Sequence, residues 1–139
     1  MIGSIFAALY VGHTVADHWL QTDTQARTKG EPGLHGALVC AGHALIVTLF
    51  KVLTLWSLAM VTGWRPGLTR TIIVLAIVGA SHWLIDRRKP LRDLAVYMGK
   101  GPFYDLGDSE KAPTGTGRYT LDQAAHLLVI WLAALAIYP

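Results

Sequence analysis

Four long apolar stretches, separated by polar segments, constrain the fold more than any other feature of the chain. They cover approximately residues 2–20, 34–61, 69–86 and 120–138. A helix of about 20 apolar residues is long enough to cross the hydrocarbon core of a bilayer, which is about 30 Å thick. Only 15% of the 139 residues are charged, whereas soluble domains average about 25%. The sequence therefore predicts an all-α integral membrane protein, a four-helix bundle formed by one domain, residues 1–139.

The distribution of positive charge predicts the orientation of this bundle. Nine of the 12 Lys and Arg residues lie in the polar segments 21–33 and 87–119, whereas the opposite side carries Arg65 and Arg70. The positive-inside rule then makes both polar segments cytoplasmic and places both termini on the non-cytoplasmic side. Residues 91–98 alternate at helical spacing and predict a short helix on the membrane surface. The Gly- and Pro-rich residues 99–117 predict a loop.

Pairs of histidine and aspartate recur at a spacing of four residues, which places both side chains on one face of a helix. The pair is His13 and Asp17 in the first stretch and His82 and Asp86 in the third. In the fourth stretch the order is reversed, with Asp122 before His126. This reversal keeps each histidine deeper than its aspartate in every helix, because alternate helices run in opposite directions. The second stretch contributes His43 at the same depth as the other histidines.

Buried ionisable side chains are costly in a membrane, so this layering predicts a shared site. Imidazole and carboxylate ligands suit Zn, Fe or Mn, and the set is large enough for one or two divalent ions. We expect the aspartates Asp17, Asp86 and Asp122 to be ligands or a catalytic general base. The alternative is that the same groups form ordinary hydrogen bonds between helices. The predicted metal ligands are His13, Asp17, His43, His82, Asp86, Asp122 and His126.

Other polar residues near this layer have different expectations. Lys29, Arg87 and Arg88 are candidates to hold an anionic substrate at the mouth of the site, and Gln21 extends the first helical stripe by one turn. His18 is expected at the membrane interface, His35 at a wet helix end, and Cys40 is expected to be a small apolar side chain. Lys51 is expected near the non-cytoplasmic surface, with its ammonium group reaching water.

Three functions fit these residues. The first is a metal-dependent membrane hydrolase that acts on a lipid-linked or amphiphilic substrate. The second is a redox or di-iron enzyme, although such four-helix sites use Glu-x-x-His motifs and both glutamates, Glu31 and Glu110, lie in polar segments. The third is a metal transporter or sensor, which would need polar groups along its whole path.

The expected partners are the lipid bilayer, a lipid-linked substrate and a second copy of the chain in a homodimer. The net charge of +3 comes without an aromatic-interleaved basic patch or a nucleic-acid motif. We therefore expect no nucleic-acid partner.

The spacing of the polar residues resembles one known family. The residues are His13-x-x-x-Asp17-x-x-Leu20-Gln21, Lys29, His43, His82-x-x-Ile85-Asp86 and Asp122-Gln123-x-x-His126. They resemble DUF3307, a family of small bacterial and phage integral membrane proteins of unknown function. The resemblance implies a multi-pass protein of the bacterial cytoplasmic membrane whose motif residues form its site, with Gln123 among the substrate-binding groups. It implies no activity. His18 stands where we would expect an apolar or aromatic residue.

Overall fold

The computed structural model describes residues 1–108 and 110–138, and this part of the chain is helical without strands. The predicted all-α class is confirmed. The elements in chain order are α1 (Ile2–Val15), η1 (Ala16–Leu20), α2 (Asp23–Thr28), α3 (Gly33–Thr62), α4 (Leu68–Asp86), α5 (Lys89–Tyr97), α6 (Gly101–Tyr104), η2 (Pro113–Gly115) and α7 (Gly117–Ile137).

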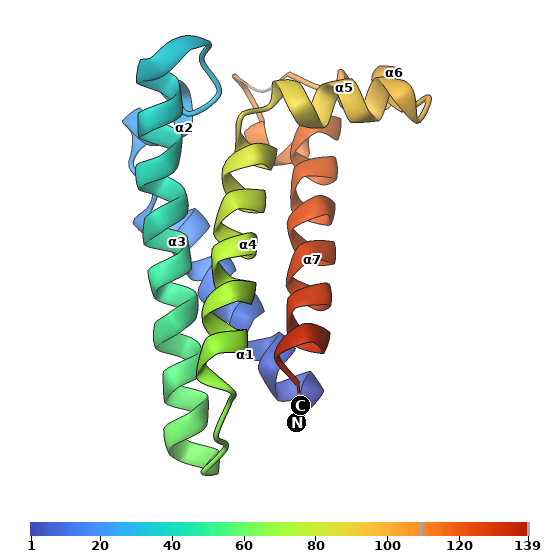
Figure 1. The fold of residues 1–139 in the computed structure, drawn as a ribbon. Coiled ribbons are helices and arrows are strands. Elements are labelled where there is room, and N and C mark those ends of the chain that lie inside the picture. Colours follow the sequence, from blue (N-terminus) through green and yellow to red (C-terminus); the bar gives the residue numbers. More distant parts are fainter. Residues whose placement is uncertain (109, 139) are drawn as a thin grey trace.

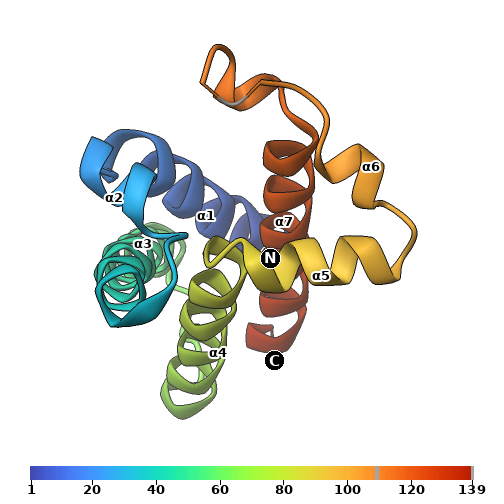
Figure 2. The ribbon, with the colours of Figure 1, turned by 90° about the horizontal axis from the view of Figure 1, so that it is seen from above.

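Helices α3, α4 and α7 run roughly along one direction, and α1 slants across them (Figures 1 and 2). Helix α1 contacts α3 and α7, and α4 contacts the same two helices from the other side. Both termini lie at one end of this group, and α2, α5 and α6 lie at the other (Figure 1). Helices α3, α4 and α7 are long and apolar enough to cross a membrane.

The first predicted stretch is helical throughout, but its last turn is wider than an α-helix. Helix α1 has 14 residues, and the chain continues without a break into η1, a π-helical segment of five residues that contains Asp17 and His18. A π-helical turn changes the direction of its side chains relative to the preceding helix, and such turns are frequent at functional sites.

The segment predicted as a simple cytoplasmic loop contains the short helix α2. Thr22 Oγ1 accepts a hydrogen bond from Gln25 N, and Gln25 Oε1 accepts one from Thr22 N. This reciprocal capping box stabilises the start of a helix. The end of α2 is attached to the end of α4, because Arg88 Nη2 donates to Ala26 O at 2.7 Å and Arg87 Nη1 donates to Lys29 O at 2.8 Å. These contacts direct Lys29 toward the interior of the helix group.

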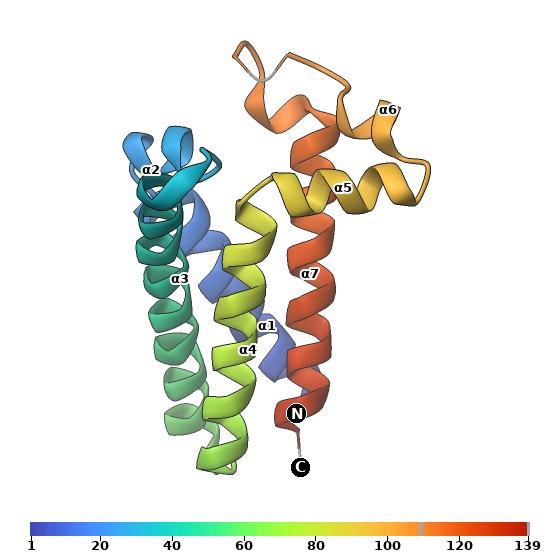
Figure 3. The same cartoon turned by 45° about the horizontal axis from the view of Figure 1, so that its top comes forward.

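The short helix predicted over residues 91–98 is present as α5, which lies crosswise at the end of the helix group (Figure 3). Leu91 and Ala95 face inward and pack against Tyr104 and Leu121, whereas Tyr97 is exposed. The region predicted as a loop also contains α6 and the single turn η2. Its chain is therefore folded back against the start of α7.

The half of the interior that lies near the termini is apolar. Its buried core comprises Ile5, Leu9, Leu55, Leu75, Val78, Ile130, Ala133, Ala134 and Ile137.

Lys51 lies in the interior with 1% of its surface exposed, so the prediction that it reaches the non-cytoplasmic surface is wrong. Helix α3 has 30 residues, close to the predicted stretch, so the error lies in the depth assigned to Lys51. Lys51 is about 27 Å from the start of this helix at 1.5 Å per residue and well short of its end. The glycine opposite it lets α1 approach closely, since a Cβ atom on Gly12 would lie 3.0 Å from Lys51 Cα and 2.7 Å from Thr54 Oγ1.

Candidate metal centre

The four long helices bring all seven predicted ligands together at the end of the interior near α2 and α5. Three overlapping groups each offer one ligand atom per residue, and within each group these atoms lie within 4.8 Å of one another. The groups are His13, His82 and His126; Asp17, His43, His82 and Asp86; and Asp86, Asp122 and His126. His82 and Asp86 of α4 each belong to two groups, so α4 supplies the centre of the cluster.

The imidazole rings form the deep layer of this cluster. The ring centroids of His82 and His126 are 4.3 Å apart, those of His13 and His126 are 4.8 Å apart, and those of His43 and His82 are 5.1 Å apart. All four rings are buried. The i, i+4 spacing on α4 and α7 puts a carboxylate one turn nearer the α5 end than each of their histidines.

Two carboxylates approach two histidines with distances that suit a tetrahedral ion. Asp17 Oδ1 lies 2.9 Å from His43 Nε2 and 3.9 Å from His82 Nε2. Asp86 Oδ2 lies 3.4 Å and 3.1 Å from the same two nitrogens. Ligand atoms at about 2.1 Å from a tetrahedral zinc ion are separated by about 3.4 Å. The four observed distances bracket this value.

Several nitrogen atoms of the cluster have no hydrogen-bond partner among the described residues. Both ring nitrogens of His13 and of His82, and Nε2 of His126, are buried without a hydrogen-bond partner. His82 Nε2 is close to Asp86 Oδ2, but the contact lacks the alignment of a hydrogen bond. A buried polar atom without a partner costs about 1–3 kcal/mol. The donor set and its unpartnered nitrogens could therefore hold a metal ion.

Lys29 places its ammonium group among the carboxylates of the cluster. Lys29 Nζ lies 3.0 Å from Asp86 Oδ2 and 3.8 Å from Asp17 Oδ1, and its side chain is 12% exposed. Part of the negative charge is thus neutralised by the chain itself. Helix α2 and the Arg contacts at its end hold Lys29 in this place.

Two glutamine side chains form hydrogen bonds to histidine and aspartate atoms of the cluster. Gln123 Nε2 donates to Asp17 Oδ2 and to Asp122 Oδ2, both at 3.2 Å. Gln21 Nε2 lies 3.1 Å from His43 Nε2. Amides that orient metal-binding carboxylates and imidazoles commonly tune such sites.

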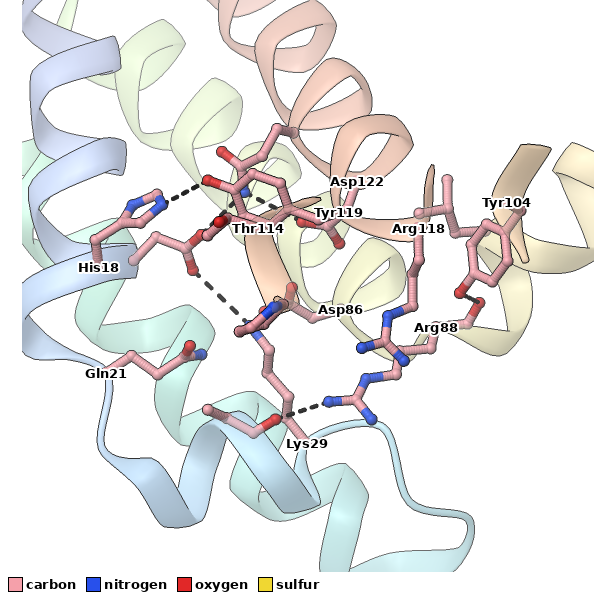
Figure 4. Close-up of a pocket in the computed structure, with 15 residues that line it drawn as sticks. His18, Gln21, Lys29, Asp86, Arg88, Tyr104, Thr114, Arg118, Tyr119 and Asp122 are labelled. Atoms are coloured by element: carbon pink, nitrogen blue, oxygen red, sulfur yellow. Dashed lines mark hydrogen bonds and ion pairs between the residues drawn. The ribbon is translucent and has the colours of Figure 1, made fainter. Parts of the chain in front are cut away.

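A cavity of about 200 Å³ lies next to the carboxylates and is shown in Figure 4. Asp17, Asp86 and Asp122 line it, together with three cationic residues from three segments of the chain. These residues are Lys29 after α2, Arg88 between α4 and α5, and Arg118 in the first turn of α7. The cavity therefore combines carboxylates of the cluster with cationic side chains, one of which, Lys29, is paired with Asp86.

The structure does not bring Arg87 to this cavity. Its guanidinium group donates to Lys29 O and to Glu31 O, the latter at 2.5 Å, and lies 6.0 Å from the centroid of the Trp83 ring. Its contacts hold the chain that leads from α2 to α3. His35 is exposed and Cys40 Sγ donates to Trp83 O at 3.4 Å; neither belongs to the ligand groups.

The cavity also contains residues that sequence reasoning missed. Arg118, Tyr119, Thr114 and Tyr104 come from the polar segment 87–119 that precedes the fourth apolar stretch. One local signal marks the start of α7, because Thr116 Oγ1 accepts a hydrogen bond from Tyr119 N as an N-terminal cap.

Two further polar side chains complete the cavity wall. Burial raises the pKa of the Tyr104 phenol, which stays protonated and donates to Arg88 O at 3.3 Å. His18, expected at the membrane interface, is exposed but also lines the cavity, and its Nε2 lies 2.9 Å from Tyr119 Oη.

The comparisons with known proteins give one family. Residues 5–139 match the model of a protein of unknown function, DUF3307. No curated protein and no solved structure gives a significant match. The matched region contains all seven clustered histidines and aspartates and the residues of the cavity. The chain therefore belongs to the DUF3307 family.

Proposed function

We propose that the protein is a membrane-embedded, metal-dependent hydrolase that acts on a lipid-linked or amphiphilic substrate from the cytoplasmic side. One observation carries this proposal. A buried set of histidines and aspartates, with unpartnered nitrogens, lies next to a cavity that three cationic side chains also line. Such a site can hold a metal ion and an anionic group side by side.

The membrane arrangement that we propose is a four-helix bundle. Helices α3, α4 and α7 cross the bilayer, and α1 with η1 forms the fourth span. Nine of the 12 Lys and Arg residues belong to the segments at the α2 and α5 end, so the positive-inside rule makes this end cytoplasmic. Both termini are then on the non-cytoplasmic side of a bacterial cytoplasmic membrane.

In this proposal the histidines, Asp17 and Asp86 hold one or two ions of Zn, Fe or Mn. A divalent ion at this position supplies a Lewis acid and an activated water molecule. Asp122 is the most accessible of the three aspartates, with 19% of its side chain exposed, and we assign it the role of general base. Lys29 and Arg88, with Gln21 and Gln123, bind the anionic part of the substrate, and the structure adds Arg118 to this set.

The alternative functions have less support. The di-iron reading lacks its usual ligands, because Glu31 and Glu110 lie outside the three ligand groups. The transport reading is opposed by the apolar core that fills the half of the interior near the termini. Among the described residues, one charged side chain, that of Lys51, is buried between the cluster and that core.

Metal content per chain of the protein purified in detergent tests the first part of the proposal. We expect one or two equivalents of Zn, Fe or Mn in the wild type and in His35→Ala, a histidine outside the cluster. We expect the loss of this metal in His82→Ala and in Asp86→Ala. If the wild type holds no metal even after reconstitution, and the variants remain folded, the cluster is ordinary hydrogen-bonded packing and the proposal is wrong.

Hydrolysis of a panel of lipid phosphates and esters tests the second part. The metal-loaded wild type is compared with Asp122→Asn, which keeps the shape of the side chain and loses its basicity. We expect turnover of at least one phosphate-bearing lipid and its loss in the variant. If the metal-loaded protein hydrolyses none of these lipids, the proposed hydrolase activity is wrong, whereas the metal site is unaffected by this result.

A further inference from the structure

A groove of about 160 Å³ lies between α1 and α7, on the side of the molecule next to the metal cluster. Its lining residues are Tyr10, His13, Gln123, Ala124 and Leu127. Tyr10 and Leu127 are 45% and 42% exposed, whereas His13 is 2% exposed. The groove therefore leads from the outer surface of the helices to a buried ring of the cluster. In the bundle proposed above, this outer surface faces lipid.

The groove adjoins the cavity at one side chain, because Gln123 lines both of them. On the cavity side, its amide donates to Asp17 and Asp122. Nearer the α5 end, η1, which continues α1, is joined to α7 by the contact between His18 and Tyr119. Figure 4 shows this contact beside the cavity. Polar contacts thus close the seam between α1 and α7 at its cytoplasmic end, and the groove opens below them.

The chemistry of the two adjoining spaces differs. The cavity presents Lys29, Arg88 and Arg118, which suit a phosphate group. The groove presents the Tyr10 ring, Ala124 and Leu127 at the depth of the membrane interior, which suit a hydrocarbon chain. A water-soluble phosphate would use the cavity alone, whereas an amphiphile would use both spaces.

We propose that the groove between α1 and α7 receives the apolar chain of a phosphate-bearing lipid whose head group lies in the cavity. The inference rests on the proposed function, because it names the substrate class of the same site. The lipid enters sideways from the bilayer, and its chain moves from the surrounding lipid into the groove without passing through water. Gln123 lies at the junction between the head group and the chain.

A photoreactive lipid tests this inference. The probe is phosphatidic acid with a diazirine in the middle of one acyl chain, and the protein is the full chain in phosphatidylcholine nanodiscs. We expect labelling at Tyr10, Ala124 or Leu127, mapped by mass spectrometry. Ala124→Trp fills the groove and should lose most of this labelling. Ala136→Trp, at another exposed alanine of α7 outside the groove, should keep it.

Two further arms identify the ligand chemistry. A diacylglycerol probe with the same chains and no phosphate should label the groove less than phosphatidic acid does. Excess glycerol 3-phosphate should compete only weakly, because it lacks the chain. Equal labelling by the two lipid probes would overturn the inference, as would labelling spread evenly around the helices. Labelling that survives Ala124→Trp, or a groove crosslinked to a second copy of the chain, would also overturn it.

Metal content and hydrolysis are measured on the same samples, so the two proposals can fail separately. A protein that holds metal and hydrolyses lipid phosphate, yet is not labelled in the groove, refutes the inference alone. A protein labelled in the groove without metal or hydrolysis refutes the proposed function alone.

Discussion

The two halves of the helix group solve the same packing problem with different side chains. The half near the termini buries aliphatic residues against one another. The half near α5 buries four imidazoles and the carboxylates of Asp17 and Asp86, with the ammonium group of Lys29 between them. Both halves use the same four helices, and the boundary falls within single turns, as between His126 and Ile130 on α7. The apolar half is filled by aliphatic side chains, whereas the polar half contains buried ring nitrogens that have no hydrogen-bond partner among the described residues.

Substitutions on either side of this boundary should have different consequences, and the largest expected effect is on metal binding. His126→Ala removes a ligand shared by two groups, and we expect metal affinity to fall by more than about 100-fold, beyond the effect of losing a supporting group. Ile130→Ala, one turn away, leaves an empty space in the apolar core and should lower the free energy of unfolding by about 3 kcal/mol. The variant should still bind the metal. Isothermal titration with Zn²⁺ and thermal unfolding measure the two effects. Equal metal loss in both variants would contradict the division into halves.

The next effect concerns the balance between Lys29 and the metal. Lys29→Met leaves Asp17 and Asp86 without their ammonium partner, and breaking such a buried pair costs about 3 kcal/mol. We expect the metal-free variant to unfold more easily and to recover stability with Zn²⁺, because the ion then neutralises both carboxylates. Unfolding is followed with and without metal, and Lys111→Met, at an exposed loop lysine, is the control. A variant that is equally destabilised at saturating metal would show that Lys29 acts by packing alone.

A smaller effect is expected from the amide that orients the carboxylates. Gln123→Leu keeps the approximate size of the side chain and removes the hydrogen bonds to Asp17 and Asp122. Metal affinity should fall about tenfold, as is common for groups that support ligands. Titration of the same metal measures it. Ala124→Leu, at the neighbouring position, should leave the affinity unchanged, and an equal fall there would point to a general disturbance of α7.

The smallest effect lies outside both halves, in the contact between α5 and the end of α6. The hydrogen bond from Arg92 lowers the pKa of the exposed Asp105 carboxyl. The contact therefore contributes stability above the ordinary Asp pKa and loses it as the pH falls through the lower folded value. Because both groups are exposed, salt should weaken it. An NMR titration of the Asp105 carboxyl checks the direction, and Asp93→Asn, whose pair with Lys89 lies within α5, should not change it.

The core of the site could be predicted from sequence because helices convert spacing into position. The pairs at four-residue spacing on α4 and α7, and the depth of His43, depend only on helix geometry and on alternating direction. The apolar length of the stretches similarly predicted α3, α4 and α7 to within a few residues.

Features that depend on tertiary contacts could not be predicted in this way. The place of Lys29 depends on α2 and on Arg side chains that bind backbone carbonyls, so charge alone predicted a residue at the mouth rather than among the carboxylates. The burial of Lys51 depends on the close approach at Gly12. Arg118 and Tyr119 join the cavity because α7 begins earlier than its apolar pattern does. The wider turn η1 has no simple sequence signal.

The position of Lys29 has a consequence for how such a protein is made. A membrane protein is inserted as its chain is synthesised, before any ion has reached its interior. Two adjacent buried carboxylates would repel each other at that stage. Lys29, which directly follows α2, gives the newly inserted chain a cation of its own. In the membrane arrangement and metal site proposed above, folding and metal loading can then be separate events, because the ammonium group neutralises the carboxylates before an ion binds.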